Sequence, residues 1–130
     1  MNKKTIGSFG EDAAAEYLQS KNYKILARNY FGTHGELDII AYDIKSDTII
    51  FAEVKTRKNK MYGFASESIG KTKLKRLVGT AKQFIFENPS ESQIRFDVIE
   101  VYYKISGGAP VTAEINHIEN AFFDLSEFTT

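Results

Sequence analysis

Two apolar runs separated by only four residues constrain the fold of this chain most strongly. Residues 36–43 (ELDIIAYD) and 48–55 (TIIFAEVK) are rich in β-branched and aromatic side chains, which favour strands. Because the connection is so short, the runs must pair as an antiparallel hairpin in which the numbers of opposite residues sum to 91. Apolar side chains fall on both faces of this hairpin, so each face requires a covering layer.

The rest of the chain can supply those layers. Residues 7–21 are alanine-rich, and residues 71–88 carry apolar side chains at helical spacing. The pattern predicts an α/β protein of one domain over 1–130, with a mixed β-sheet flanked by helices in the order α-β-β-β-α-β-β. Its first three strands are expected to form an antiparallel meander. The predicted elements are helices over 7–21 and 71–88, strands over 23–30, 36–43, 48–55, 93–104 and 111–119, and a loop over 56–70.

The composition excludes several classes of site. The sequence has no cysteine, which rules out disulfides, thiolate metal sites and cysteine nucleophiles and suits a reducing compartment. No apolar run approaches the roughly 20 residues of a membrane span, and residues 1–18 lack the apolar core of a signal peptide. We therefore expect a cytoplasmic protein with no membrane partner, in which carboxylates do any metal binding.

Charge is balanced over the chain but unevenly distributed. Lys and Arg together number 17, as do Asp and Glu. The segments 1–52, 53–82 and 83–130 carry net charges of −1, +7 and −6. A basic segment on a neutral protein is typical of a phosphate-binding face, although a solvated face gives the same pattern. The residues predicted to bind nucleic acid are Arg57, Lys58, Lys60, Lys71, Lys73, Lys75 and Arg76.

The hairpin register brings charged side chains together at the end away from the turn. It places Asp38 opposite Glu53, and Glu36 opposite Lys55, on one face. Two like charges in a largely buried position destabilise the fold unless a cation or a proton intervenes. Mg²⁺ (or Mn²⁺) suits such a pair, because it binds one or two carboxylates together with water and phosphate oxygens. Lys55, on the same face, is then near the metal-bound water.

The same hairpin has a purely structural explanation. Glu36 and Lys55 can form a cross-strand ion pair, with Asp38 and Glu53 near solvent at the end of the sheet. The opposite face is predicted to be apolar throughout, and it consists of Leu37, Ile39, Ala41, Ile50, Ala52 and Val54.

The helix before the hairpin carries a carboxylate on its apolar stripe. Glu11 lies on one stripe of the helix with Ala14 and Leu18, because these residues are three and four positions apart. An inward-facing carboxylate is costly unless it is paired, hydrogen-bonded or bound to metal. Alternatively, Glu11 lies in the first helical turn, where the helix dipole favours a negative charge.

These residues resemble a known family. Asp38 followed by Glu53-Val54-Lys55 is similar to the signature of the restriction-endonuclease-like, or PD-(D/E)XK, superfamily, and the predicted order of elements is similar to its common core. Longer segments resemble the YraN-like family, a bacterial group related to archaeal Holliday-junction resolvases. Those segments are Gly10-Glu11, Arg28-Asn29, GELDII (35–40), FAEVKTR (51–57), Phe96-Asp97-Val98 and Asn120-Ala121-Phe122. The resemblance extends over nearly the whole chain and implies a restriction-endonuclease-like fold.

The resemblance also implies roles for single residues. Asp38, Glu53 and the main-chain carbonyl of Val54 would bind the metal. Lys55 would be the catalytic lysine, and Glu11 an auxiliary ligand of the metal or of water. Leu37 stands where the superfamily often has proline, a difference that leaves the neighbouring acid intact.

Three functions are compatible with the sequence. The leading hypothesis is a metal-dependent nuclease that hydrolyses DNA phosphodiesters, with branched or damaged DNA as candidate substrates. The second is a non-catalytic nucleic-acid-binding module on the same fold, and the third is a domain that docks an acidic protein. Paired carboxylates favour the first over the second, because a module that only binds phosphates does not need them. The sequence does not specify the oligomeric state, so a homodimer stays open.

Overall fold

The computed structural model describes residues 3–58 and 71–121, and the predicted helices and strands appear in the predicted order. Helix α1 begins at Lys3, four residues before the predicted start. Strand β3 includes 56–57 of the predicted loop, and residues 59–70 of that loop lie outside the described residues. The elements are α1 (Lys3–Ser20), β1 (Tyr23–Gly32), β2 (Gly35–Asp43), β3 (Thr48–Arg57), α2 (Lys71–Glu87), β4 (Gln93–Ser106) and β5 (Ala109–Ile118).

The strands form a mixed five-stranded sheet in chain order, β1-β2-β3-β4-β5. Neighbouring strands are antiparallel except β3 and β4, which run parallel. Parallel strands need a long crossover connection, and α2 lies within the one that joins them. The antiparallel meander is confirmed, and so is the hairpin register from Ile39↔Ala52 to Asp43↔Thr48, where opposite residues sum to 91.

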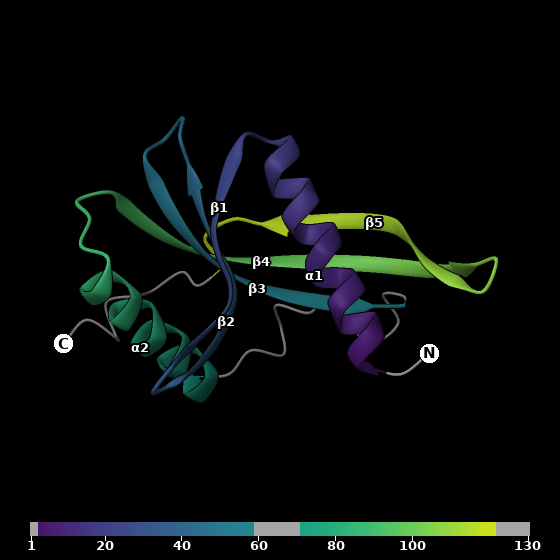
Figure 1. The fold of residues 1–130 in the computed structure, drawn as a ribbon, viewed down its shortest axis with the longest axis horizontal. Helices are drawn as coiled ribbons and strands as arrows, with labels where there is room; N and C mark the ends of the chain where they lie inside the picture. The colour runs from purple at the N-terminus through teal and green to yellow at the C-terminus, as the bar shows by residue number, and fades with distance from the viewer. Residues whose placement is uncertain (1–2, 59–70, 122–130) are drawn as a thin grey trace.

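The two helices cover the two faces of the sheet (Figure 1). The α1-side core contains Ala14, Ala15, Leu18, Ile39, Ala41, Ile50, Ala52, Ile99 and Val101. The α2-side core contains Leu37, Ile40, Ile49, Phe51, Leu77, Val78, Ala81, Phe84 and Phe96. The β2–β3 hairpin is therefore buried on both faces near its turn, as its apolar pattern predicts.

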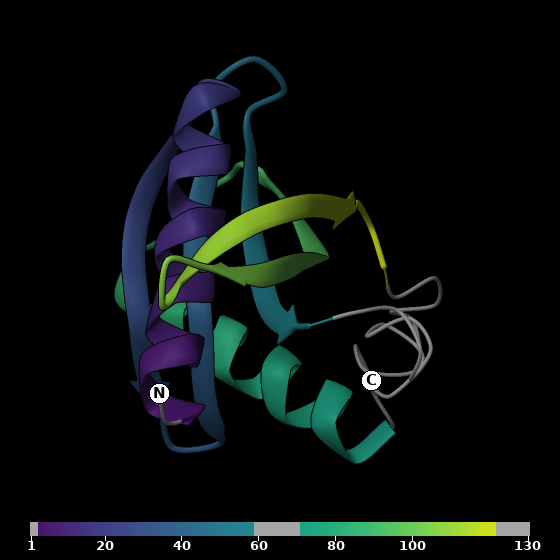
Figure 2. The ribbon, with the colours of Figure 1, turned by 90° about the vertical axis from the view of Figure 1, so that its right-hand side faces the viewer.

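The sheet is strongly twisted, so that β4 and β5 cross the direction of β1 and β2 (Figure 2). Strand β3 belongs to both halves, because it pairs with β2 near the hairpin turn and with β4 along its whole length. The twist therefore separates β2 from β3 beyond the paired part of the hairpin. Neither helix of the described chain has the length and apolar composition of a membrane span.

One side chain of β2 lies on the face opposite to the predicted one. Leu37 packs in the α2-side core, whereas strict alternation from Ile39 predicts the α1 side. The β1–β2 ladder passes from Arg28↔Ile39 directly to Tyr30↔Leu37. Between these pairs, Asn29 has φ of 51°, in the left-handed region that asparagine tolerates. We attribute the change of face to this local distortion of the ladder.

Candidate active site

The β2–β3 ladder ends just before the predicted carboxylate pair. Its last pair is Ile39↔Ala52, and beyond it β3 continues with β4 as far as Arg57↔Tyr102. The Asp38 carboxylate replaces a main-chain partner, since its Oδ2 accepts a 2.7 Å hydrogen bond from the Val54 N–H. The ladder pairing that we predicted for Asp38 and Glu53 is therefore replaced by a side-chain bridge between the separating strands.

Glu53 is the buried acid of this site, with 8% of the residue exposed. Its Oε1 lies 2.7 Å from Nζ of Lys73 on α2 and 3.5 Å from Nζ of Lys55 on its own strand. Among the residues that the structure describes, Lys55 forms an ion pair with Glu53 and none with Glu36, in contrast to the structural alternative. The sequence motif Glu-Val-Lys folds into a strand in which alternate residues share a face, which brings both charged groups together.

Negative charge accumulates around Asp38. Burial, followed by the charge of Glu53, raises the pKa of Asp38 to about 7 despite the hydrogen bond from Val54. The charges of Glu11 and Glu36 make smaller contributions to the same rise. Asp38 therefore carries a proton more readily than a typical aspartate, and a cation bound here would favour its ionised form.

The two lysines differ in their electrostatics. Burial lowers the pKa of Lys55, and the adjacent Lys73 lowers it further. Burial also lowers the pKa of Lys73, but the hydrogen bond to Glu53 opposes this effect, and the pKa of Lys73 is raised above the ordinary value. Lys73 is therefore the more firmly charged partner of Glu53.

Helix α1 places Glu11 beside this cluster. A Cβ at Gly10 would lie 1.8 Å from Oγ1 of Thr56, so only glycine allows this close approach of α1 to β3. Burial raises the pKa of Glu11, while hydrogen bonding to the Asn29 side chain opposes the shift. Because α1 begins at Lys3, Glu11 lies about two turns into the helix, and the explanation from the first-turn dipole is wrong.

The predicted nucleic-acid-binding residues have different surroundings. Lys73 contacts Glu53, while Arg76 and Lys73 line a groove of about 520 Å³ together with Gly35, Glu36, Thr72 and Leu77. Lys58 and Lys75 are exposed, and Arg57 is half-buried. Lys60 and the side chain of Lys71 lie outside the described residues. The groove therefore connects the carboxylate site with exposed basic residues of α2.

The candidate site contains few protein groups that could act as metal ligands. Within residues 3–58 and 71–121, no group of three or more Asp, Glu or His side chains is arranged to hold a metal. A metal bound here would have two carboxylates, those of Asp38 and Glu53, and the main-chain carbonyl of Val54 as protein ligands. Such a set fits Mg²⁺, which keeps several waters and binds substrate phosphate oxygens.

Three contributions to the site were missed by the sequence reasoning. The contact of Lys73 with Glu53 depends on how α2 packs, which no local pattern specifies. Asn29 had two signals, as a turn-forming residue within a strand and as part of the Arg28-Asn29 segment of the family resemblance, but neither indicated its hydrogen bond to Glu11. The third residue, Glu100, is fully buried, lies next to Lys55 in the β3–β4 backbone register and accepts hydrogen bonds from Tyr102 and Asn116. Its signal in the sequence is that it is the lone charge in the run VIEVYY.

A second buried acid forms a separate cluster on β4. Asp97 is fully buried and receives two 2.9 Å bonds from the Arg95 guanidinium, one from His117 Nε2 at 2.7 Å and one from the Asn120 N–H at 2.9 Å. His117, to which the sequence assigned no role, also contacts the Tyr17 hydroxyl at 3.1 Å. This cluster links α1 to β4 and β5.

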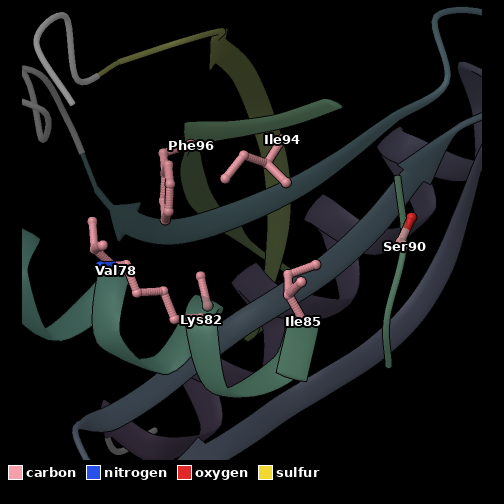
Figure 3. Close-up of a pocket in the computed structure, with 7 residues that line it drawn as sticks. Val78, Lys82, Ile85, Ser90, Ile94 and Phe96 are labelled. Carbon is pink, nitrogen blue, oxygen red and sulfur yellow. The ribbon is translucent and has the colours of Figure 1, made fainter. Parts of the chain in front are cut away.

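An apolar cavity of about 230 Å³ lies between α2 and the start of β4 (Figure 3). It is lined by Val78, Ala81, Lys82, Ile85, Ser90, Ile94 and Phe96. Its lining within the described residues contains no carboxylate and shares no residue with the carboxylate site, so the cavity is separate from that site.

The sequence similarity between this chain and other proteins covers the whole candidate site. Residues 10–101 match the family described as uncharacterised protein family UPF0102. A UPF0102 protein of Clostridioides difficile (strain 630) is 46% identical over 123 residues, which are 94% of this chain and 100% of the relative. UPF0102 proteins of Caldanaerobacter subterraneus subsp. tengcongensis and Caldicellulosiruptor saccharolyticus are 42% and 41% identical, each over 94% of this chain and over 98% and 100% of the relative. The family match includes Glu11, Asp38, Glu53 and Lys55.

Proposed function

The chain belongs to the uncharacterised protein family UPF0102, the YraN-like family indicated by its motifs, and we propose that it is a metal-dependent nuclease that hydrolyses DNA. The observation that carries this proposal is the Asp38 carboxylate, held by the Val54 N–H beside buried Glu53, with its pKa raised to about 7. Titratable groups with strongly shifted pKa values concentrate at functional sites.

We further propose that the fold is restriction-endonuclease-like. The order α-β-β-β-α-β-β, the mixed sheet and the placing of Asp38 and Glu53 where β2 and β3 separate support this proposal. Fold alone does not determine function, so the nuclease proposal depends on the site rather than on the superfamily.

The residues have distinct roles in the proposed reaction. Asp38, Glu53 and the Val54 carbonyl would hold Mg²⁺ or Mn²⁺, and Glu11 would orient water. A bound divalent cation supplies charge neutralisation at the scissile phosphate and increases the acidity of water. The Lys55 ammonium group, next to Glu53, would stabilise the negative charge that develops on the phosphate. Hydrolysis adds water across one P–O bond and leaves a 5′-phosphate and a 3′-hydroxyl, as in the superfamily.

A second candidate, a non-catalytic nucleic-acid-binding module, is favoured by one observation. Glu53 has two lysine partners within the chain, so its charge is balanced by side chains of the protein itself. Under this alternative, the acids and lysines of the site stabilise the fold, and the exposed basic residues of α2 bind phosphate.

The test is a cleavage assay with Mg²⁺ or Mn²⁺ on linear, nicked, flapped and four-way DNA. We expect the parent to cut at least one of these, and Asp38→Asn and Glu53→Gln to reduce the rate by at least about 100-fold. Glu16→Gln removes the same charge from an exposed position of α1 and serves as the matched control, with parental activity. Metal-dependent DNA binding without cleavage by the parent would support the second candidate instead.

A further inference from the structure

Two ammonium groups contact one carboxylate oxygen in the candidate site. Lys73 Nζ lies 2.7 Å from Glu53 Oε1, and Lys55 Nζ lies 3.5 Å from the same atom. The closer contact comes from helix α2, not from the strand that carries the Glu-Val-Lys motif. Lys73 therefore occupies a position at the Glu53 oxygen that a bound cation would need.

The Lys73 side chain also has an open route away from Glu53. It is 42% exposed, whereas the side chain of Glu53 is 9% exposed. Lys73 lines the groove that also contains Thr72 and Arg76. Its long, flexible stem can thus carry the ammonium group either to the buried carboxylate or to an anion in the groove.

We propose that Lys73 is the internal counter-ion of Glu53, which a divalent cation displaces toward the groove to bind a phosphate there. The inference rests on the proposed metal site. An ammonium group and a divalent cation at one oxygen repel each other strongly, because the site is partly buried and poorly screened. Displacement relieves this repulsion and places a positive charge beside the DNA path only after the metal has bound.

The first test measures Mn²⁺ binding to the full chain without DNA, by titration with electron paramagnetic resonance detection of free Mn²⁺. Lys73→Met removes the competing charge while retaining most of the stem, and we expect it to bind Mn²⁺ about tenfold more tightly than the parent. Lys73→Arg keeps the charge and should bind like the parent. Lys45→Met loses the same charge at the hairpin turn and should also bind like the parent.

The second test uses inorganic phosphate as the probe. In saturating Mn²⁺, Lys73→Met should bind phosphate several-fold more weakly than the parent, and without metal the two should not differ. Equal phosphate binding in Mn²⁺ would overturn the displacement. Lys73→Gln provides a second neutral variant, and thermal unfolding without metal establishes that each variant is folded.

The outcomes separate this inference from the proposed function. If the parent binds Mn²⁺ and Lys73→Met binds it no more tightly, the counter-ion inference is wrong while the metal site stands. If neither protein binds Mn²⁺, the metal site itself is wrong and the inference falls with it. Binding by Lys73→Met alone supports the competition directly.

Discussion

Two buried aspartates of the same sheet have opposite electrostatic surroundings. Asp97 receives hydrogen bonds from Arg95, His117 and the Asn120 N–H. Although burial opposes the effect, these partners hold the pKa of Asp97 below its ordinary value. Asp38, by contrast, accepts a hydrogen bond from Val54 and is surrounded by further acids, and its pKa is raised.

The difference distinguishes a structural carboxylate from one suited to binding. The charge of Asp97 is compensated within the folded chain, so its cluster needs nothing further. Around Asp38, the charges of Glu11, Glu36 and Glu53 raise the pKa of its carboxyl. The two lysines of the site contact Glu53. Like charges crowded in a partly buried position reduce stability, and in the proposed function a bound cation would compensate for them.

We expect the largest effect on stability from a substitution at Asp97, the aspartate with a structural role. Asp97→Asn removes the nearer charged partner of the Arg95 guanidinium, whose side chain is 19% exposed and which keeps a longer contact of 3.7 Å with Glu119. We expect the free energy of unfolding to fall by about 3–5 kcal/mol. Asp38→Asn should cause no loss at pH 8, because it removes one of several mutually repelling charges. Urea unfolding of both variants measures the difference, and similar losses would mean that Asp38 is also structural.

The pH dependence of stability should have opposite signs at the two aspartates. Asp38 binds its proton more tightly in the folded state, because its pKa rises from 3.8 to about 7. Its stabilising contribution is therefore complete below about pH 4 and is lost as the pH rises through 7. Relative to Asp38→Asn, the parent should lose at most about 4 kcal/mol across this range.

Asp97 should behave in the reverse manner. Its lowered pKa gives a contribution that is present above about pH 4 and is lost as the pH falls through the folded-state value. Urea unfolding from about pH 2 to about pH 9 in the absence of divalent metal provides both curves, because the contribution of Asp97 is lost only below about pH 4. A parent and an Asp38→Asn variant with parallel curves would show that the Asp38 carboxyl is not perturbed.

Local sequence patterns predicted the paired part of the hairpin well. A four-residue connection and apolar residues on both faces leave one register, which the structure has from Ile39 to Asp43 on β2. Asp43 also stabilises the turn, as its carboxylate accepts bonds from the Lys45 N–H and the Ser46 hydroxyl. These interactions are short-range, so the sequence alone specifies them.

The rest of the site depends on contacts between distant parts of the chain. The ladder ends at Ile39↔Ala52 because β3 follows β4 through the twist of the sheet, and a hairpin pattern contains no information on that twist. Lys73 reaches Glu53 only through the packing of α2 on the sheet. The Arg95–Asp97 pair is visible as alternate residues of one strand, but its His117 partner requires the β4–β5 register.

Besides Lys73, which contacts Glu53, helix α2 carries exposed basic residues that can be tested for phosphate binding. Charge reversal at Lys73 would disturb Glu53 as well as any phosphate contact. Lys75 and Arg76 are exposed neighbours on the same helix, and Arg76 lines the groove. They therefore test the nucleic-acid face with less effect on the carboxylates.

Lys75→Glu combined with Arg76→Glu should weaken DNA binding across sequences while leaving the unfolding free energy nearly unchanged. If each residue contacts one phosphate, the slope of log affinity against log salt should decrease by about 0.9 per contact on duplex DNA, because fewer counterions are released. Fluorescence anisotropy at several salt concentrations, in EDTA to prevent cleavage, measures this slope. Lys24→Glu with Lys45→Glu makes the same change of net charge at exposed positions of β1 and of the β2–β3 turn, and it should retain the parental slope. Equal slopes for the parent and the α2 variant would identify this surface as solvated only, and docking of an acidic protein would then become the hypothesis to test.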